Sequence, residues 1–561
     1  MQKDKLRVGL LLDGTEVAAW ACRMIEVIRQ SDYAGISLVV QVNGAPREPS
    51  SPVSGMADPV SSPAPWSAAV RKLLAATERF LVGKPGQLPN AFAGVDVKEL
   101  TTGIDVVKMR PRRHQGSDLI EGDDLAHIRA RNIDVFICLG SQRPPGEIMR
   151  CARHGTWSCR LGSGKVNAGE VSGYREVIES RPITESMVEI LTEDPNNEKV
   201  ICRSFSSTND MSLEDNRNGV QWKALHLIPR KLKELHEVGA ETFFIRANEE
   251  SVRLQSDEGR APKTLTNSEW GVLLWRKLLQ KIERKWTDLF YFRQWFLLCD
   301  FQHTVSHDFR HFKKLIPPKD RFWADPFVVA RNDKYFVFIE EFLFARQRGH
   351  ISLVVIDRDG THEPSVRVLE TPYHLSYPFI FEFDDDLYLI PESFENRTVE
   401  LYRCTAFPLK WEFQRNLMED CWMVDTTLLQ WQGKWWMFAG RIETAGASPS
   451  DELYIYSSDS PISDKWTPHR RNPVVSDVRT ARPAGRLFVR NGRLFRPSQN
   501  SSRHYGYGFN ICEITKLTET EYEERIVSRV EPMWDKNVVS THTINFEGGL
   551  TIIDGQLWRR R

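Results

Sequence analysis

The feature that most constrains the fold of this sequence is a repeat in its second half. A short apolar strand, a tight turn and a second strand recur five times, with equivalent positions 52, 48, 57 and 60 residues apart. A period near 50 residues, built from short strands, is typical of a propeller with one four-stranded blade per copy. We therefore expect an all-β, five-bladed propeller over residues 300–561. The five copies are FWADPFVVARNDKYFVFIEE (322–341), LSYPFIFEFDDDLYLIPES (375–393), MVDTTLLQWQGKWWMFAGR (423–441), ARPAGRLFVRNGRLFRPSQ (481–499) and STHTINFEGGLTIIDG (540–555).

Polar side chains occupy the equivalent position of every copy. The innermost strands of a propeller line its central channel, so equivalent residues converge on one mouth. An Asp before Pro or Thr is by itself a common turn residue, and that interpretation stays open for each aspartate. Five such positions together predict a ring that can bind the hydroxyl groups of a sugar. The ring consists of Asp325, Tyr377, Asp425, Arg482 and His542.

Further acids and an aromatic residue accompany this ring. Glu340 and Glu392 lie fifteen residues after the ring positions of the first two copies. Glu341 follows directly, so either acid of the first copy could face the mouth. Trp323 is expected to stack on a sugar face. These side chains are predicted to bind substrate together with Tyr377 and the two cationic members of the ring.

The propeller half resembles the family 43 type glycoside hydrolases. It is closer still to the propeller-like N-terminal region of plant glucosamine inositolphosphorylceramide transferases. The hydrolase resemblance implies a carboxylate base, a carboxylic acid and a third acid that tunes the second. It assigns Asp325 as base or nucleophile, Asp425 as the tuning acid and Glu392 as the general acid. The sequence departs from the hydrolase pattern in one respect, because the glutamate comes from the copy between the two aspartates. The positive charges of Arg482 and His542 suit a phosphate-bearing sugar.

The first half of the sequence alternates strands and helices. An unbroken apolar strand such as IDVFICL is typical of a parallel sheet that is covered on both faces. We therefore expect a doubly wound α/β domain over residues 1–240. Its predicted elements are strands at 7–12, 36–42 and 133–139 and helices at 16–29 and 67–82, with a Pro- and Ser-rich loop at 45–66.

Within that domain, GTWSCRLGSGKVNAGEVSGYREVIESRP (155–182) resembles the formyltransferase N-terminal domain. On this alignment the catalytic asparagine of the family falls on Ser158 and its histidine on Arg160. Arginine stays protonated and cannot act as a base, so formyl transfer is not expected. A binding site could persist at the carboxyl ends of the parallel strands, near Gly14, Ser158, Arg160 and Lys165. The alternative is that these are a turn glycine and surface polar groups.

A stretch between the two domains, WGVLLWRKLLQKIERKWTDLFYFRQWF (270–296), combines aromatic residues and cations with helical spacing. It lies in a predicted linker over residues 241–299. Such a helix could contact a membrane surface through rings and cations. The alternative, which the sequence favours, is a connector whose aromatic stripe packs on one or both domains.

Composition excludes several classes of protein. Lys plus Arg equals Asp plus Glu at 75 each, which argues against a nucleic-acid partner. The nine cysteines form no C-x-x-C pair, so we expect reduced thiols and no metal site. No segment approaches the apolar length of a membrane span or a signal peptide. The expected location is cytoplasmic, peripheral at the inner face of the membrane.

Two functions stay open at this point. In the first, the propeller is a glycosyl-transferring or glycoside-hydrolysing enzyme acting on a glycan, a glycolipid or a nucleotide sugar. In the second, it recognises a glycan or glycolipid without catalysis. A sugar N-formyltransferase is a third and weaker interpretation. No cofactor is expected beyond a nucleotide sugar as donor.

Overall fold

The computed structural model describes residues 3–42, 89–109, 112–114, 117–119, 122–140, 143–162, 173–194, 197–255, 267–301 and 309–561. The chain divides into two compact units. The first consists of Met1–Ser204, Thr208–Leu279 and Thr444–Ala447, and the second of Phe205–Ser207, Gln280–Glu443 and Ser448–Arg561. The predicted loop at 45–66 and the predicted helix at 67–82 lie outside the described residues.

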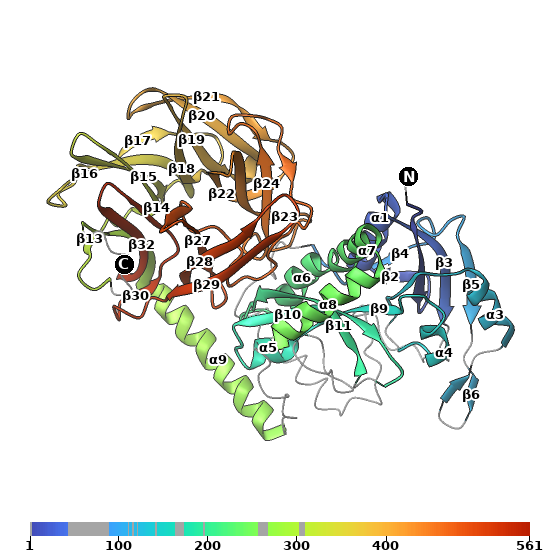
Figure 1. Ribbon diagram of the computed structural model, residues 1–561. Coiled ribbons are helices and arrows are strands. Elements are labelled where there is room, and N and C mark those ends of the chain that lie inside the picture. The colour runs from blue at the N-terminus through green and yellow to red at the C-terminus, as the bar shows by residue number, and fades with distance from the viewer. Residues whose placement is uncertain are drawn as a thin grey trace. The chain divides into compact units, whose positions relative to one another are not determined.

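The first unit contains a seven-stranded sheet in the order β11-β10-β9-β8-β1-β3-β5 (Figure 1). Five neighbouring strands, from β9 to β5, run parallel, and β10 is antiparallel to β9. The predicted strands at 7–12, 36–42 and 133–139 are confirmed. The strands are β1 (Leu6–Leu12), β3 (Ala34–Val42), β5 (Asp105–Met109), β8 (Val135–Cys138), β9 (Thr156–Leu161), β10 (Ile183–Leu191) and β11 (Lys199–Ser207).

Helices cover both faces of this sheet, as the unbroken apolar strands predict. On one face, Leu10 of β1 packs in a core with residues of α1 (Ala19–Gln30) and α7 (Leu227–Val238). On the other, Leu11 packs with α3 (Gly122–Ala130) and α4 (Gly146–Met149). The remaining elements are β2 (Glu16–Ala18), β4 (Gly94–Asp96), β6 (Arg112–His114), β7 (Ser117–Leu119), α5 (Tyr174–Ile178), α6 (Leu213–Ala224) and α8 (Ala240–Gln255).

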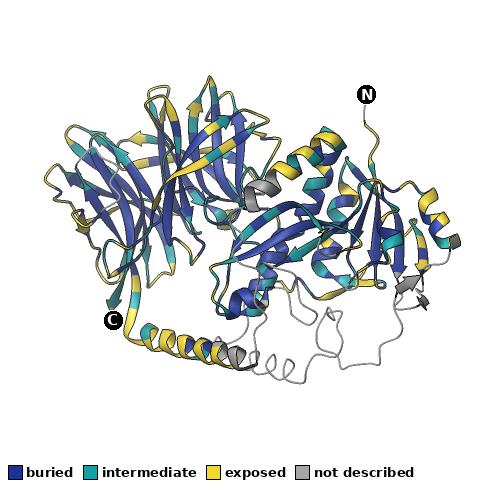
Figure 2. Cartoon of the chain, turned by 60° about the horizontal axis from the view of Figure 1, so that its bottom comes forward, coloured by how far each residue is buried: buried dark blue, intermediate teal, exposed yellow. Residues whose placement is uncertain are grey.

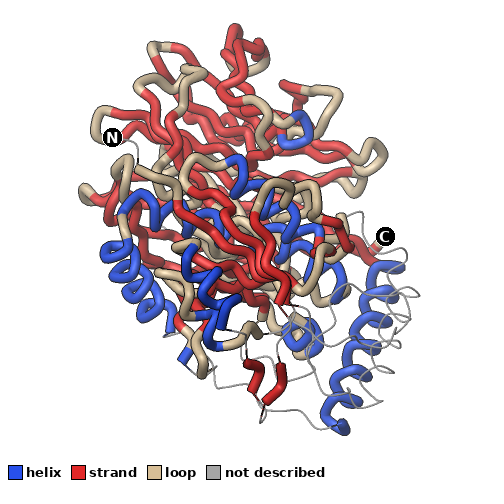
Figure 3. The backbone as a smooth tube through the Cα atoms, turned by 90° about the vertical axis from the view of Figure 1, so that its right-hand side faces the viewer, coloured by secondary structure: helices blue, strands red, loops and turns tan. Residues whose placement is uncertain are grey.

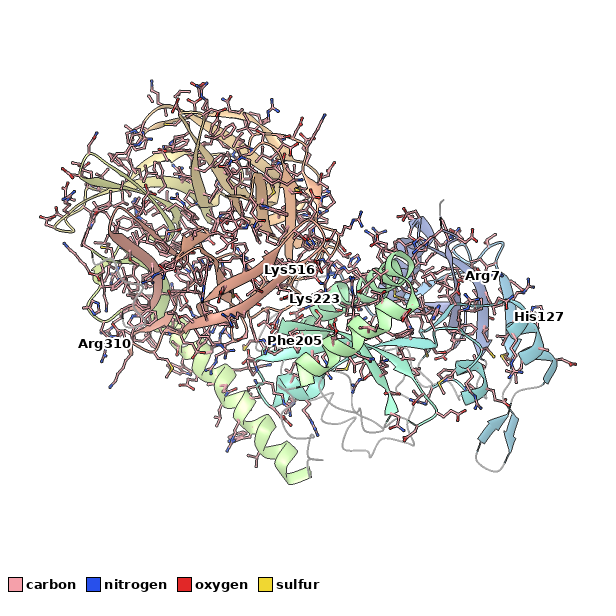
Figure 4. The ribbon with its side chains drawn as sticks, viewed as in Figure 1. Arg7, His127, Phe205, Lys223, Arg310 and Lys516 are labelled. Atoms are coloured by element: carbon pink, nitrogen blue, oxygen red, sulfur yellow. The ribbon has the colours of Figure 1, made fainter. Side chains whose placement is uncertain are left out.

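Two details of the first unit differ from or extend the prediction. The helix expected from residue 16 begins at Ala19, because Glu16–Ala18 pair as a short strand with β4. The backbone N–H of Arg7, a residue of β1 that is labelled in Figure 4, donates to Asp134 Oδ2 at 2.9 Å, which ties β1 to the start of β8.

The second unit contains the five predicted blades. Four of them are consecutive four-stranded antiparallel sheets along the chain. Their strands are β14 (Arg321–Arg331), β15 (Lys334–Leu343), β16 (Arg348–Asp357) and β17 (Val366–Leu369); β18 (Ser376–Phe383), β19 (Asp386–Ser393), β20 (Thr398–Ala406) and β21 (Lys410–Met418); β22 (Trp422–Trp431), β23 (Lys434–Ile442), β24 (Leu453–Ser458) and β25 (Thr467–Pro468); and β26 (Phe488–Arg490), β27 (Arg493–Asn500), β28 (Gly508–Leu517) and β29 (Tyr522–Val530).

The fifth blade joins both ends of the propeller. The late strands β31 (Ile544–Glu547) and β32 (Leu550–Arg560) pair with each other, and β32 pairs over ten residues with the early strand β12 (Tyr291–Asp300). On the far side of β12 lies β13 (Lys313–Leu315), and β30 (Val538–Ser540) also pairs with β32. Arg561 therefore lies beside the start of β12, where its N–H donates to the Phe290 carbonyl (Figure 3). This pairing closes the ring.

The turns within the repeats explain the sequence signal. Each first hairpin turns through two residues with left-handed backbone, as a type I′ turn requires. This is why Asn-Asp, Asp-Asp, Gln-Gly and Asn-Gly pairs mark the copies. The residues are Asn332 and Asp333, Asp384 and Asp385, Gln432 and Gly433, Asn491 and Gly492, and Gly548 and Gly549.

The predicted helix between the domains is shorter than expected. The observed helix, α9 (Asn267–Phe290), ends six residues before Phe296. From Tyr291 the chain continues directly as β12, so the propeller begins before residue 300. The run Trp295–Cys299 is apolar enough for either structure, and pairing with β32 decides it. Among the described residues, none of the helices combines the length and hydropathy needed to cross a membrane.

Candidate functional site

A strained bulge recurs at the ring position of the first three blades. Asp325, Tyr377 and Asp425 have left-handed backbone, with φ of 50°, 42° and 54°. At each of them the pairing of the first two strands shifts register. A bulge turns a side chain away from its place in the ladder, and left-handed backbone is costly for residues other than glycine. Such strain, repeated in three blades, is typical of a functional centre.

Asp325 belongs to a chain of charged groups between the first and fifth blades. Its Oδ1 lies 3.4 Å from His542 Nε2 and accepts a hydrogen bond from Thr543 Oγ1 at 2.7 Å. On the other side of the imidazole, Nδ1 lies 2.6 Å from Asp554 Oδ2. The His542 ring is therefore held between two carboxylates, and all three side chains are at most 5% exposed.

Asp425 and Arg482 form a second buried group, from the third and fourth blades. Arg482 donates to both Asp425 oxygens, at 2.6 and 3.1 Å, and its Nη2 also reaches Glu392 Oε2 at 3.4 Å. Gln499 donates to Asp425 at 2.8 Å. The ring of the sequence prediction thus brings Asp325, Asp425, Arg482 and His542 together at the centre, with Glu392 as their neighbour.

The open choice between Glu340 and Glu341 is settled by strand alternation. Glu340 lies 3.3 Å from His374 Nε2, and burial, then the charges of Asp325 and Glu392, raises its pKa, so it belongs to the central group of acids. Glu341 points to the opposite side. There it accepts hydrogen bonds from Trp323, Ser352 and Ser365.

Burial and mutual repulsion separate the pKa values of the central acids. Burial raises the pKa of Asp325 to about 6, which the charge of His542 partly opposes. Burial, then the charges of neighbouring acids, holds the pKa of Glu340 and Glu392 well above the usual range. For Glu392, Asp425 contributes both by its charge and by a hydrogen bond. Burial disfavours the His542 cation, but Asp554 and Asp325 outweigh it and raise the His542 pKa.

These shifts define a site with two kinds of carboxyl group. Burial and the neighbouring acids favour the protonated form of Glu340 and Glu392, while Asp325, with a pKa of about 6, favours the ionised form at neutral pH. A protonated acid near an ionised carboxylate is the arrangement that general acid–base chemistry needs.

Three predicted substrate contacts have other roles in the structure. Trp323 is 3% exposed and donates its indole N–H to Glu341 inside the first blade, so it offers no face to a sugar. Glu341 is occupied by that network. Tyr377 is fully buried; its hydroxyl lies 2.9 Å from Thr427 Oγ1 and accepts from the Gly485 N–H at 2.8 Å. The hydroxyl of Tyr377 therefore supports the centre from within.

Sequence reasoning missed several members of the site. Asp554 lies at the end of the apolar run LTII on β32, where an acid in a buried strand was the available signal. Trp295 of β12 stacks on His542 with ring centroids 4.3 Å apart. Tyr505 is 49% exposed, and Arg482 lies over its ring at 5.0 Å. Tyr505 therefore supplies the exposed aromatic face that Trp323 does not.

One group of side chains could also hold a metal ion. Ligand atoms of Asp325, His542 and Asp554 all lie within 4.8 Å of one another. Oxygen and imidazole donors fit a divalent cation. In the structure, however, His542 is closely paired with Asp554, and a metal would need a neutral imidazole.

The predicted second site, in the α/β unit, has fewer available groups. Arg160 of β9 pairs with Glu189 at 2.6 Å, on the neighbouring strand β10. Ser158 lies opposite Glu189 in the ladder and is half-buried. Gly14 follows β1, with open space around the position of a Cβ. Lys165 lies outside the described residues.

The turn into β9 depends on a glycine. Gly155 has a left-handed φ of 84° directly before the strand. A Cβ there would approach Ile190 to 2.8 Å, so this turn requires glycine.

Comparison with known proteins gives matches to the propeller unit. Residues 316–541 match the domain family described as "Glucosamine inositolphosphorylceramide transferase 1, N-terminal". Over 206 residues the chain is 36% identical to Glucosamine inositolphosphorylceramide transferase 1 of Oryza sativa subsp. japonica and 33% identical to that of Arabidopsis thaliana. This stretch is 36% of the chain and 27% of each relative, so the chain matches only about a quarter of their length.

Solved structures similar to the chain include two glycoside hydrolases. The catalytic domain of the Coprinopsis cinerea GH62 alpha-L-arabinofuranosidase is 10% identical with a TM-score of 0.33, covering 43% of this chain and 94% of that one. The family 117 hydrolase Zg3597 of Zobellia galactanivorans is 10% identical with a TM-score of 0.31, covering 42% and 85%. In sequence, the propeller of this chain is thus similar to the N-terminal domain of the glucosamine inositolphosphorylceramide transferases.

Proposed function

We propose that the centre of the propeller is a catalytic site that transfers or hydrolyses a glycosyl group. The observation that carries this proposal is the separation of pKa values within one buried cluster. Burial, then the charge of Asp425, raises the pKa of Glu392 well above its usual range, and burial raises the pKa of Asp325 to about 6. An acid and a base with opposed protonation are the groups that glycosidic bond cleavage requires.

Each group then has a defined part in the reaction. Glu392 donates its proton to the oxygen of the leaving group as the glycosidic bond breaks. Asp325 accepts the proton of the attacking hydroxyl, which belongs to water in hydrolysis and to an acceptor in transfer. Asp425 tunes Glu392 by charge and hydrogen bond, and its double contact with Arg482 fixes its position.

The positive charges of the site do not serve as free phosphate ligands. Arg482 is shared by Asp425 and Glu392, and His542 lies between Asp325 and Asp554. We infer instead that the charge of His542 favours the ionised form of Asp325, and that Arg482 fixes Asp425 in position through two hydrogen bonds. This modifies the expectation from sequence that Arg482 and His542 bind a phosphate-bearing sugar.

The substrate class follows from the sequence relatives, as part of the proposal. They are named glucosamine inositolphosphorylceramide transferases, so we take the substrate to be a glycolipid with an inositol phosphate head group. For a transfer reaction, the donor would be a nucleotide sugar. Tyr505, the exposed ring beside Arg482, would stack on the sugar.

A recognition function without catalysis is the second candidate. The observation that favours it is low exposure: the side chains of Glu392 and Asp425 are 10% and 2% exposed. A substrate can reach such groups only if the centre opens. A pure binding protein would use the rim around Tyr505 and keep the buried charges as internal support.

One experiment separates these functions. The wild type and the Glu392→Gln variant would be incubated with nucleotide sugars and inositol phospholipids, and the mixtures analysed by mass spectrometry. Because glutamine cannot donate the proton, we expect consumption of substrate by the wild type and a loss of about a thousandfold in the variant. Asp420→Asn is the control, since Asp420 is a 92% exposed surface acid. Binding of a ligand that both proteins return unchanged would leave recognition as the function.

For the α/β unit we propose ligand or partner binding without formyl transfer. This rests on its resemblance to a formyltransferase domain in which Ser158 and Arg160 replace the catalytic pair. Arg160 is neutralised by Glu189 and cannot take up a proton. A formyl donor assay on the complete chain would test it, with detectable transfer as the contradicting result.

A further inference from the structure

Helix α9 exposes a continuous apolar stripe. Figure 2 shows the described part of α9 mostly in the colour of exposed residues, as far as its junction with β12. Large apolar side chains on it are between 39% and 63% exposed. Six of them lie on one side, Val272, Trp275, Leu279, Ile282, Trp286 and Leu289, and Phe290 at the end of the helix is 49% exposed.

The stripe occupies one side of the helix. Its members follow one another at alternate spacings of three and four residues, which places them within an arc of about 100°. The opposite side carries Lys277 and Lys281, which are only 6% and 7% exposed. Lys277 Nζ lies 3.4 Å from Asp210.

This pattern is the reverse of an ordinary surface helix. Such a helix buries its apolar side and exposes its lysines. Here each large apolar side chain that stays in water forgoes about 1.5–3 kcal/mol of burial free energy. A stripe of this size on a soluble chain is typical of an interaction surface.

Cations gather beside the C-terminal half of the stripe. Burial, then the charge of Arg284, lowers the pKa of Arg293. Burial, then the charges of Arg293, Arg284 and Arg503, lowers the pKa of His504. Like charges therefore lie close together. Arg560 and Arg561 are exposed, and Arg561 donates to the carbonyl of Phe290 at the end of α9. Two acids of the same half, Glu283 and Asp288, offset this charge only in part.

We propose that α9 lies in the interface of an anionic lipid bilayer. The apolar stripe would reach the acyl boundary, Trp275 and Trp286 would sit at the level of the head groups, and the arginines would face lipid phosphates. Over 24 residues the helix is about 36 Å long, so it would lie along the surface.

A second copy of the chain is less well suited to this stripe. Alternate spacings of three and four also occur in coiled coils, but two tryptophans would have to enter the seam. Pairing two copies would also bring the arginine groups of both into one region. Charge complementarity therefore favours lipid over self-association.

The same strand that follows α9 leads to the candidate site. Trp295 of β12 stacks on His542, five residues beyond the end of the helix. Arg503, which acts on His504 with Arg284, lies two residues before Tyr505. If the proposed function holds, a lipid head group bound beside α9 would meet the site at its exposed aromatic rim.

Vesicle cosedimentation of the complete chain tests the docking proposal. The probes are vesicles of phosphatidylcholine alone and vesicles that also contain phosphatidylserine or phosphatidylinositol. We expect binding to the anionic vesicles only, and its loss in Trp275→Ser/Trp286→Ser. Arg284→Gln/Arg293→Gln should weaken binding by about thirtyfold at low salt, since each cation near such a surface contributes about fivefold.

The control replaces apolar residues of equal exposure elsewhere. Phe413 on β21 and Val489 on β26 are 53% and 51% exposed, so the variant Phe413→Ser/Val489→Ser should bind vesicles like the wild type. Leu289→Asp, at a 63% exposed position, repeats the test with one change if the tryptophan variant fails to fold.

Three results would overturn the proposal. Wild type that does not sediment with anionic vesicles has no such docking surface. Equal binding to neutral vesicles would remove the role of the arginines. A wild type that is dimeric by sedimentation velocity, and monomeric after the tryptophan changes, would assign the stripe to a second copy. The measurement does not depend on catalysis, so its failure is distinct from failure of the proposed function.

Discussion

The two units of this chain differ in how they balance buried charge. In the α/β unit, buried acids form direct ion pairs with arginines: Arg160 pairs with Glu189 at 2.6 Å and Arg203 with Glu185 at 2.8 Å. At the propeller centre, five acids lie around two cations, and one of the acids, Glu340, also lies 3.3 Å from His374 Nε2. The acids are Asp325, Glu340, Glu392, Asp425 and Asp554, and the cations are Arg482 and His542.

The balance of buried charge indicates which unit carries a reactive site. A matched ion pair can hold two strands together and needs no further explanation. Burial and mutual repulsion raise the pKa values of Asp325, Glu340 and Glu392, which costs stability, so the retention of these acids points to a use in proton transfer. We therefore assign a reactive centre to the propeller and a structural role to the ion pairs of the α/β unit.

The sharpest contrast is in turnover. Asp325→Asn should lower the consumption of substrate by about a thousandfold, because the amide cannot take up a proton. Arg160→Met in the α/β unit should change turnover by less than about twofold. Both are measured by mass spectrometry with the substrate found for the wild type. Equal losses in the two variants would break the distinction between the units.

Stability should respond next most strongly. Arg482→Met leaves Asp425, whose side chain is 2% exposed, without its cation, so we expect a loss of about 3–5 kcal/mol in the free energy of unfolding. Denaturant titration measures this. The double variant Arg482→Met/Asp425→Asn should recover most of the loss, because no buried charge remains unpaired. A loss below about 1 kcal/mol in the single variant would show that water already reaches Asp425.

The pH dependence of stability is a third comparison. Burial raises the pKa of Asp325 from 3.8 to about 6, so the folded chain binds an extra proton between these values. The stability that this proton contributes is present below about pH 4 and is lost as the pH rises through 6. Relative to Asp325→Asn, the wild type should lose on the order of 3 kcal/mol between pH 4 and 7. A difference that stays flat over this range would contradict the raised pKa.

The smallest expected effect concerns Tyr377. Tyr377→Phe keeps the ring but removes the hydroxyl that contacts Thr427 and accepts from Gly485. Because the Gly485 N–H is then left unpaired, we expect a loss of about 1–3 kcal/mol in unfolding free energy with little change in ligand affinity. Calorimetry gives both values. A large change in affinity with unchanged stability would return Tyr377 to the substrate contacts.

The sequence was sufficient for the propeller, because its information is repeated. Five hairpins with the same turn chemistry fix the blades and the ring position, and the bulges at Asp325 and Asp425 follow that repeat. Strand β12 was missed, because Trp295–Cys299 is apolar in either structure and only pairing with the distant β32 decides. Asp554 was missed for the same reason, since its partner His542 reaches it through tertiary structure. Trp323 was misassigned, because one sequence cannot distinguish an exposed ring from a buried one.

The proposed reaction depends most on a protonated glutamic acid at the propeller centre at neutral pH. Infrared spectroscopy of the complete chain at pH 7 measures this directly, without knowledge of the substrate. We predict a carbonyl band of a buried carboxylic acid that weakens in Glu392→Gln and disappears when Glu340→Gln is added, while Asp420→Asn leaves it unchanged. Absence of that band in the wild type would mean that the central acids are ionised, and the proposed general acid would not exist.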